Sequence, residues 1–200
     1  MHHHHLFATD PRLQQAITQV KPLEIGEIGT DIYGSLLRAI VFQQLSGKVA
    51  EVIYARFVGL FNEQYPEATT LAQMPIEMLR TVGLSNQKAN YVKNIAAFSL
   101  EQNLHFDYIN SLSDEELVQY LTQIKGVGRW TVEMLLIFTL QRPDVFPILD
   151  LGIRNAMIRL YEVEETGKAQ LQRLHEIAAV WQPHRTLACR YLWRWYDSMK

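Results

Sequence analysis

Apolar residues recur at helical spacing along most of the chain. One stripe predicts a helix from Ile32 to about Leu45, and a second, at Val49, Val52, Ile53, Phe57 and Leu60, predicts the helix that follows. A C-terminal stripe consists of Leu187, Ala188, Tyr191, Leu192 and Trp195. No segment shows the alternation of apolar and polar residues that is typical of a paired strand. We therefore predict an all-α protein without an internal linker.

Several predicted helices carry start signals. Asp10 followed by Pro11 has the form of an N-cap before a proline in the first helical position. Ser113-Asp114-Glu115-Glu116 has the form of a capping box. These signals predict helices that begin near residues 11 and 114.

The most informative stretch lies between residues 121 and 154. A predicted helix from Glu115 to Ile124 breaks at Lys125-Gly126-Val127-Gly128, and an almost wholly apolar helix continues from Thr131 to about Leu140. Glycine accepts positive φ, so the two glycines favour a tight hairpin. The first N–H groups of the next helix lack intrahelical partners and attract phosphates. Because that helix is apolar on nearly every side, we expect it to be buried and its start to be held rigidly.

Asp150 stands 22 residues after Gly128, between an apolar loop and the next predicted helix. An aspartate in this position is usually an N-cap. An ionised carboxylate can also stabilise a developing cation and orient or deprotonate a water molecule. The two roles are compatible, because capping N–H groups keep a carboxylate charged and oriented.

Two adjacent glutamines, Gln43 and Gln44, occupy the predicted junction between the helices at 32–45 and 49–60. An amide offers both a donor and an acceptor and can therefore read base edges. Two solvated surface glutamines would give the same pattern.

Charge is unevenly distributed along the chain. The formal net charge is −2, which argues against a nonspecific nucleic-acid coat protein. Basic residues gather on or near the central stretch and at the C-terminus, namely Lys125, Arg129, Arg154, Arg159, Arg185, Arg190, Arg194 and Lys200. Such a local excess is compatible with DNA binding.

Histidine and cysteine usage excludes several kinds of site. The run at residues 1–5 has the form of a purification tag, and the other histidines are scattered, so we expect no catalytic metal. The single Cys189 excludes a disulfide within the chain and a cluster bound by four of its thiolates, and it favours a reducing compartment. No membrane span or signal peptide is evident, so we expect an intracellular protein that does not associate with membranes.

Four segments together resemble the helix-hairpin-helix (HhH-GPD) superfamily of DNA glycosylases, in its alkylpurine branch. They are the hairpin at residues 124–131, the aspartate segment at residues 146–154, the Gln43-Gln44 junction and a helical corner at residues 79–85. The resemblance implies two helical lobes with a central cleft. It places residues 6–30 and 150–200 in one lobe and residues 31–149 in the other.

The resemblance also implies roles for individual residues. Asp150 would be catalytic, Trp130 and Trp193 would line the pocket for the base, and Gln44 would fill the gap left by the extruded base. The implied DNA contacts are Gln43, Gln44, Lys125, Gly126, Val127, Gly128, Arg129 and Thr131. Backbone carbonyls of Thr122, Ile124 and Val127 would hold a monovalent cation, Na⁺ or K⁺, and no cofactor would be required for catalysis.

Trp130 also indicates the reaction subtype. Bifunctional members of the superfamily have a nucleophilic lysine in this position, so the resemblance implies hydrolysis by water without strand cleavage. Tryptophan suits alkylated purines, which are often cationic. Plain core packing is the alternative for each tryptophan; we expect it for Trp181 and Trp195 and leave Trp193 open.

The resemblance implies an enzyme of base excision repair that flips alkylated purines, such as 3-methyladenine and 7-methylguanine, out of double-stranded DNA and hydrolyses the N-glycosidic bond. We expect a monomer that works with DNA in a bacterial cytoplasm or nucleoid, or in a eukaryotic nucleus. The alternative is a non-catalytic helix-hairpin-helix module of a repair complex. Leu149 departs from the second acidic residue that many relatives carry there.

Overall fold

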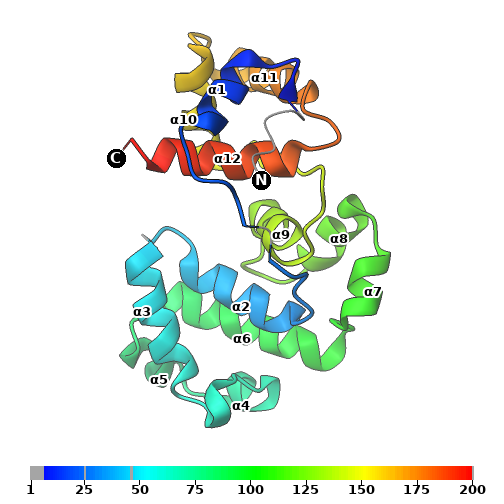
Figure 1. The fold of residues 1–200 in the computed structure, drawn as a ribbon. Coiled ribbons are helices and arrows are strands. Elements are labelled where there is room, and N and C mark those ends of the chain that lie inside the picture. Colours follow the sequence, from blue (N-terminus) through cyan, green and yellow to red (C-terminus); the bar gives the residue numbers. More distant parts are fainter. Residues whose placement is uncertain (1–6, 25, 46, 200) are drawn as a thin grey trace. The chain divides into compact units, whose positions relative to one another are not determined.

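The computed structural model describes residues 7–24, 26–45 and 47–199, and within these ranges it contains helices and no strands. This confirms the all-α prediction. The tag-like residues 1–5 and Ser46 lie outside the described residues. Contacts divide the chain into two units, the first comprising the residues up to Ile28 with Gln141–Lys200, and the second comprising Gly29–Leu140 (Figure 1). The sequence had placed the two boundaries near residues 30 and 149. None of the described helices has the length and apolar character that crossing a bilayer requires.

Unit 1 is built from α1 (Pro11–Thr18), α10 (Leu151–Tyr161), α11 (Gly167–Ala179) and α12 (Arg185–Asp197). Its core joins residues from all four helices, including Leu13, Ile17, Ile153, Met157, Leu174, Tyr191 and Leu192.

Buried Asp10 joins distant parts of unit 1. It caps α1 as predicted, because one carboxylate oxygen accepts from Leu13 N–H at 3.0 Å. Its other oxygen accepts from the Tyr161 hydroxyl at 2.6 Å and from Trp181 Nε1 at 2.8 Å. Three donors therefore satisfy the oxygens of this buried carboxyl group, as burial of a polar group requires. Trp181 is buried, in agreement with the packing role expected for it.

Unit 2 contains the remaining elements. In chain order these are α2 (Ile32–Phe42), α3 (Gly47–Val58), the 3-10 turn η2 (Asn62–Gln64), α4 (Ala68–Gln73), α5 (Ile76–Thr81), α6 (Asn86–Glu101), α7 (Phe106–Ser111), α8 (Asp114–Leu121), α9 (Arg129–Met134) and the π-helical segment η3 (Leu135–Thr139). Ser113 and Glu116 form the predicted capping box at the start of α8. Helix α6, which is the longest element of the unit, runs beside α2 (Figure 1).

Two helices of unit 2 differ from the sequence prediction. Helix α2 ends at Phe42 rather than near Leu45, because the backbone leaves the helical region at Gln43, with a ψ of 129°, and Gln44 has a positive φ of 58°. The apolar helix after the hairpin becomes π-helical at Leu135–Thr139. Phe138 in this segment is 53% exposed, although the apolar pattern predicted a helix buried on nearly every side.

Candidate functional site

Asp150 is the N-cap of α10 in unit 1. Its Oδ1 accepts from Ile153 N–H at 2.8 Å and from Trp193 Nε1 at 2.8 Å. The capping role expected from the sequence is thus confirmed, and two donors from different helices fix the orientation of the carboxylate.

Gly152 makes the contact between Asp150 and Trp193 feasible. A Cβ at position 152 would lie 3.1 Å from Asp150 Oδ1 and 3.1 Å from Trp193 Nε1. The leucines on either side of Asp150 project outward, with Leu149 56% and Leu151 64% exposed. The segment therefore presents a carboxylate between two apolar side chains.

The glycine hairpin of unit 2 is held from behind by α6. Gly126 has φ +108°, and a Cβ there would lie 2.2 Å from Cγ of Tyr91. Asn94 Nδ2 donates to the carbonyl of Lys125 at 2.9 Å. Only glycine at position 126 combines this backbone angle with such close contact to an aromatic ring. The sequence did not reveal the part played by Tyr91 and Asn94, since both lie some 30 residues away and carry no motif.

The backbone amides of the hairpin are not equivalent. Val127 N–H donates to the carbonyl of Ile124 at 2.9 Å and so closes the turn, and both of these side chains are buried. The N–H groups of Gly126 and Gly128 donate to no other group among the described residues. Of the three predicted phosphate-binding amides, two are therefore available and that of Val127 serves the turn.

The predicted cation site would consist of backbone carbonyls of the hairpin. The carbonyl of Ile124 already accepts one hydrogen bond and retains a second lone pair. Thr122, the C-cap of α8, and Val127 would contribute the other two carbonyls. The cation stays a prediction that rests on the resemblance. Within the described ranges, no group of three His, Cys, Asp or Glu side chains is arranged to hold a metal ion.

The charged side chains of the hairpin lie on the surface. Lys125 is exposed. Arg129, also predicted to contact DNA, donates through Nη2 to both carboxylate oxygens of Glu115, at 2.7 and 2.9 Å. Exposed ion pairs of this kind contribute at most about 1 kcal/mol, so a phosphate can replace Glu115 at small cost.

The two glutamines of the α2–α3 junction have separate positions. Gln43 Nε2 donates to Thr131 Oγ1 at 3.1 Å and thereby links the end of α2 to α9. Thr131 is only 1% exposed and its hydroxyl accepts the bond from Gln43, while its contact with DNA stays a prediction. Gln44 is exposed at the tip of the turn.

Lys88 of α6 supports the same junction. Its Nζ donates to the carbonyls of Val41 and Gln43, both at 2.7 Å, which satisfies two carbonyls at the end of α2. Partial burial lowers the pKa of Lys88. The amine of Lys88 is thus engaged by protein carbonyls at the end of α2.

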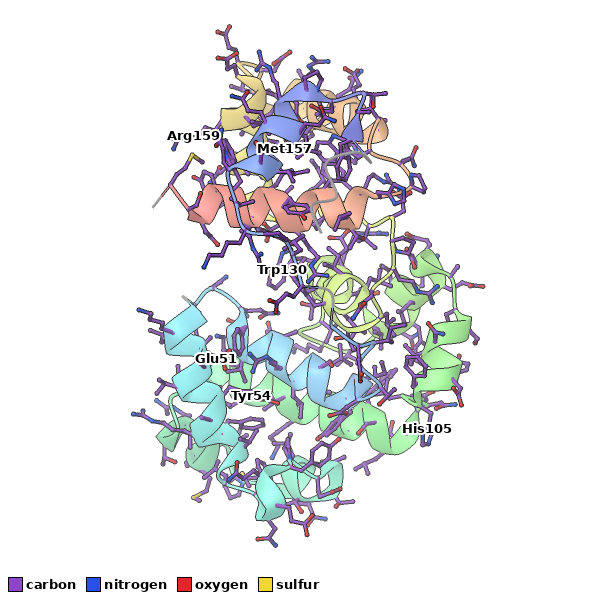
Figure 2. All side chains as sticks on the ribbon, viewed as in Figure 1. Glu51, Tyr54, His105, Trp130, Met157 and Arg159 are labelled. Atoms are coloured by element: carbon purple, nitrogen blue, oxygen red, sulfur yellow. The ribbon has the colours of Figure 1, made fainter. Side chains whose placement is uncertain are left out.

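Trp130 lines a cavity of about 260 Å³ within unit 2. One wall comes from α2 and the other from α9 and η3; the lining residues are Ser35, Arg38, Ala39, Phe42, Trp130, Met134, Leu135, Phe138 and Thr139. Figure 2 shows Trp130 at the start of α9. Exposed Phe138 belongs to this cavity, so the π-helical segment contributes to its shape.

The structure thus brings the predicted site residues together in two sets. Asp150 and Trp193 are bonded to each other in unit 1, while Trp130, Gln43, Gln44 and the hairpin belong to unit 2. The sequence missed the support from α6, and it also missed Arg38 in the cavity wall.

Comparison with known proteins agrees with these features. Residues 37–183 match the model of the HhH-GPD superfamily of base excision DNA repair proteins. DNA-3-methyladenine glycosylase 1 of Schizosaccharomyces pombe is 41% identical over 165 residues, which are 81% of this chain and 71% of the relative. The putative DNA-3-methyladenine glycosylase YfjP of Bacillus subtilis is 31% identical over 82% of this chain, which spans 58% of that protein.

Solved structures give the same result. The Schizosaccharomyces pombe 3-methyladenine DNA glycosylase Mag1, determined in complex with abasic DNA, has a TM-score of 0.85 at 34% identity, covering 94% of this chain and 93% of that chain. A DNA-3-methyladenine glycosidase from Bacillus halodurans has a TM-score of 0.77 at 30% identity, covering 97% and 88%. With its glycine hairpin backed by α6 and a capped aspartate 22 residues further along, the chain belongs to the HhH-GPD superfamily of base excision DNA repair proteins.

Proposed function

We propose that this protein is a monofunctional DNA glycosylase that removes alkylated purines, such as 3-methyladenine and 7-methylguanine, from double-stranded DNA by hydrolysing the N-glycosidic bond. The observation that carries the proposal is the Asp150 carboxylate, whose Oδ1 is fixed by Ile153 N–H and Trp193 Nε1. The relatives named for 3-methyladenine support the substrate class. The protein would act as a monomer on the DNA within the cell.

Asp150 would act on the sugar. As the N-glycosidic bond breaks, positive charge develops on the deoxyribose, and a fixed carboxylate stabilises it without reorganising. The same carboxylate can orient or deprotonate the water that attacks the anomeric carbon. Because donors already hold Oδ1, the carboxylate is oriented before the substrate arrives.

The DNA contacts would come from unit 2. The N–H groups of Gly126 and Gly128 would bind a backbone phosphate, with Lys125 and Arg129 adding charge. Gln44, exposed on a left-handed backbone at the tip of the junction, would fill the space vacated by the flipped nucleotide. Trp130 would stack on the base in the cavity between α2 and α9.

Trp130 supports hydrolysis over lyase chemistry. A covalent Schiff-base mechanism needs an amine nucleophile, which an indole ring cannot supply. We therefore expect borohydride to trap no covalent adduct between the protein and its DNA substrate. A trapped adduct would contradict the monofunctional assignment.

The decisive test compares wild type with Asp150→Asn on DNA that carries 7-methylguanine or 3-methyladenine. Asparagine caps a helix about as well as aspartate, so the fold should be preserved. We expect the single-turnover rate of base release to fall by about 10²- to 10⁴-fold. Asp31→Asn is the matched control, because Asp31 caps α2 through the same type of bond to Gly34 N–H. Equal release by wild type and Asp150→Asn would overturn the catalytic assignment of Asp150, and release by neither protein would favour the alternative, a non-catalytic DNA-binding module.

A further inference from the structure

The cavity beside Trp130 has one cationic side chain in its wall. Arg38 lies on α2, and its guanidinium carbon is 4.1 Å from the ring centre of Phe42, which lines the same cavity. The same guanidinium is 5.0 Å from the ring centre of Tyr54 on α3. Arg38 is therefore fixed between two aromatic rings instead of extending freely into solvent.

Glu51 of α3 neutralises this cation. Its Oε1 accepts a hydrogen bond from Arg38 Nη2, and the side chains of Arg38 and Glu51 are 43% and 57% exposed. Figure 2 shows Glu51 and Tyr54 on α3. An ion pair this exposed contributes little to stability, so its significance lies in the electrostatic potential at the cavity.

The charge at this wall matters because of the substrates that we propose. Alkylation of a purine ring nitrogen can leave the base cationic, and the aromatic faces of Trp130 and Phe42 attract a cation. A bare guanidinium in the same wall would repel it. The Arg38–Glu51 pair removes most of that repulsion and leaves the rest of the wall, which is mainly apolar, unchanged.

We propose that Glu51 is a specificity-determining residue which, by neutralising Arg38 at the edge of the Trp130 cavity, allows cationic alkylpurines to enter. This inference rests on the proposed function and specifies its substrate class as bases that carry a positive charge. Glu51 acts through Arg38 and need not touch the base. Removing the negative charge of Glu51 should therefore discriminate against charged bases and not against neutral ones.

The test uses the full chain with Glu51→Gln, the double variant Arg38→Gln/Glu51→Gln, and Glu176→Gln as control. Glu176 lies in unit 1, its side chain is 52% exposed, and it forms an ion pair with Arg173. Its replacement therefore makes the same charge change outside the cavity. For Glu51→Gln, single-turnover release of 7-methylguanine should slow about tenfold, while affinity for DNA with an abasic-site analogue stays unchanged. The double variant should recover most of the rate, since the unbalanced cation is gone.

A binding measurement keeps the result independent of catalysis. Tryptophan fluorescence would follow binding of two free bases, the 7,9-dimethylguaninium cation and neutral 9-methylguanine. We expect Glu51→Gln to weaken binding of the cation about tenfold relative to the neutral base, with a smaller effect in high salt. If Glu51→Gln leaves this ratio unchanged, or if the double variant fails to restore it, the proposal is overturned. Absence of base release by wild type, with the ratio shifted as expected, would instead count against the proposed function alone.

Discussion

In unit 1 the candidate functional group is a side chain, the Asp150 carboxylate, and N–H donors from α10 and α12 hold it. In unit 2 the candidate functional groups are backbone amides of the hairpin and a turn at the end of α2, and side chains of α6 hold them. A single substitution can remove the carboxylate, whereas no substitution short of proline removes an amide. The proposed catalysis by unit 1 can therefore be tested by removing a side-chain group. The proposed DNA binding by unit 2 is tested by changing the α6 side chains, or the residues they contact, that hold its backbone in place.

The largest effect is expected for Gly126→Ala. The new Cβ would overlap the ring of Tyr91 at a φ that alanine rarely adopts, so we expect a loss of about 2–4 kcal/mol in the free energy of unfolding and loss of DNA binding. Gly128→Ala is the matched control for stability, because no atom lies within 4 Å of a Cβ there. Denaturant unfolding of both variants measures the difference in their free energies of unfolding. Equal stability would mean that close packing of Tyr91 against Gly126 is not required.

Trp193→Phe separates two roles for this side chain. Phenylalanine keeps an aromatic wall for the base but lacks the N–H that donates to Asp150. If the donor matters, the single-turnover rate should fall about 10- to 100-fold, the equivalent of one hydrogen bond to a charged group. Trp195 lies on the same helix as Trp193 and donates to Gln19 instead of Asp150. Trp195→Phe should therefore leave the rate within about threefold of wild type. An unchanged rate in Trp193→Phe would mean that the aromatic surface of Trp193 matters and its hydrogen bond to Asp150 does not.

Lys88→Met tests the support of the α2–α3 junction. Methionine keeps the length and the apolar contacts but leaves the carbonyls of Val41 and Gln43 without their donor, so stability should fall by about 1–2 kcal/mol. Base flipping, followed by 2-aminopurine fluorescence next to the lesion, should weaken as well. Lys93 lies on the same helix as Lys88 and donates to the carbonyl of Met74. Lys93→Met should therefore lower stability without affecting base flipping.

The smallest expected effect is the acid sensitivity of unit 1. Hydrogen bonds from Arg185 lower the pKa of Asp144 below its usual value. Its stabilising contribution is therefore complete above the unfolded-state pKa of about 3.9 and is lost as the pH falls through the lower folded-state value. Arg185→Gln should reduce stability at pH 7 by up to about 1 kcal/mol and flatten the dependence below pH 4. If the stability of wild type and of Arg185→Gln falls equally steeply below pH 4, this prediction is wrong.

Local signals made much of the fold predictable. Asp10, Ser113 and Asp150 cap helices as their sequence context indicates, because a cap depends on residues no more than four positions away. The glycine hairpin is local in the same way. The family resemblance is confirmed by the superfamily match, and it rests on these same segments.

Long-range contacts were not predictable in this way. Nothing near Lys88 or Tyr91 indicates that one contacts the end of α2 and the other contacts Gly126. In the sequence, Tyr91 belongs to the apolar positions of this helix, and the local pattern does not distinguish Lys88 from a surface lysine. The expected end of α2 was wrong for a related reason, since the apolar pattern continues into Leu45 while the backbone turns at Gln44.

The π-helical segment Leu135–Thr139 has a consequence for how the cavity wall can be altered. A π turn behaves as one extra residue inserted in an α-helix, and such insertions are frequent at functional sites. Deleting one residue there would let the helix continue with α geometry and turn the residues beyond the deletion by about 100°. Phe138 would then leave the cavity wall, so the depth of the cavity depends on chain length at this point as well as on residue type.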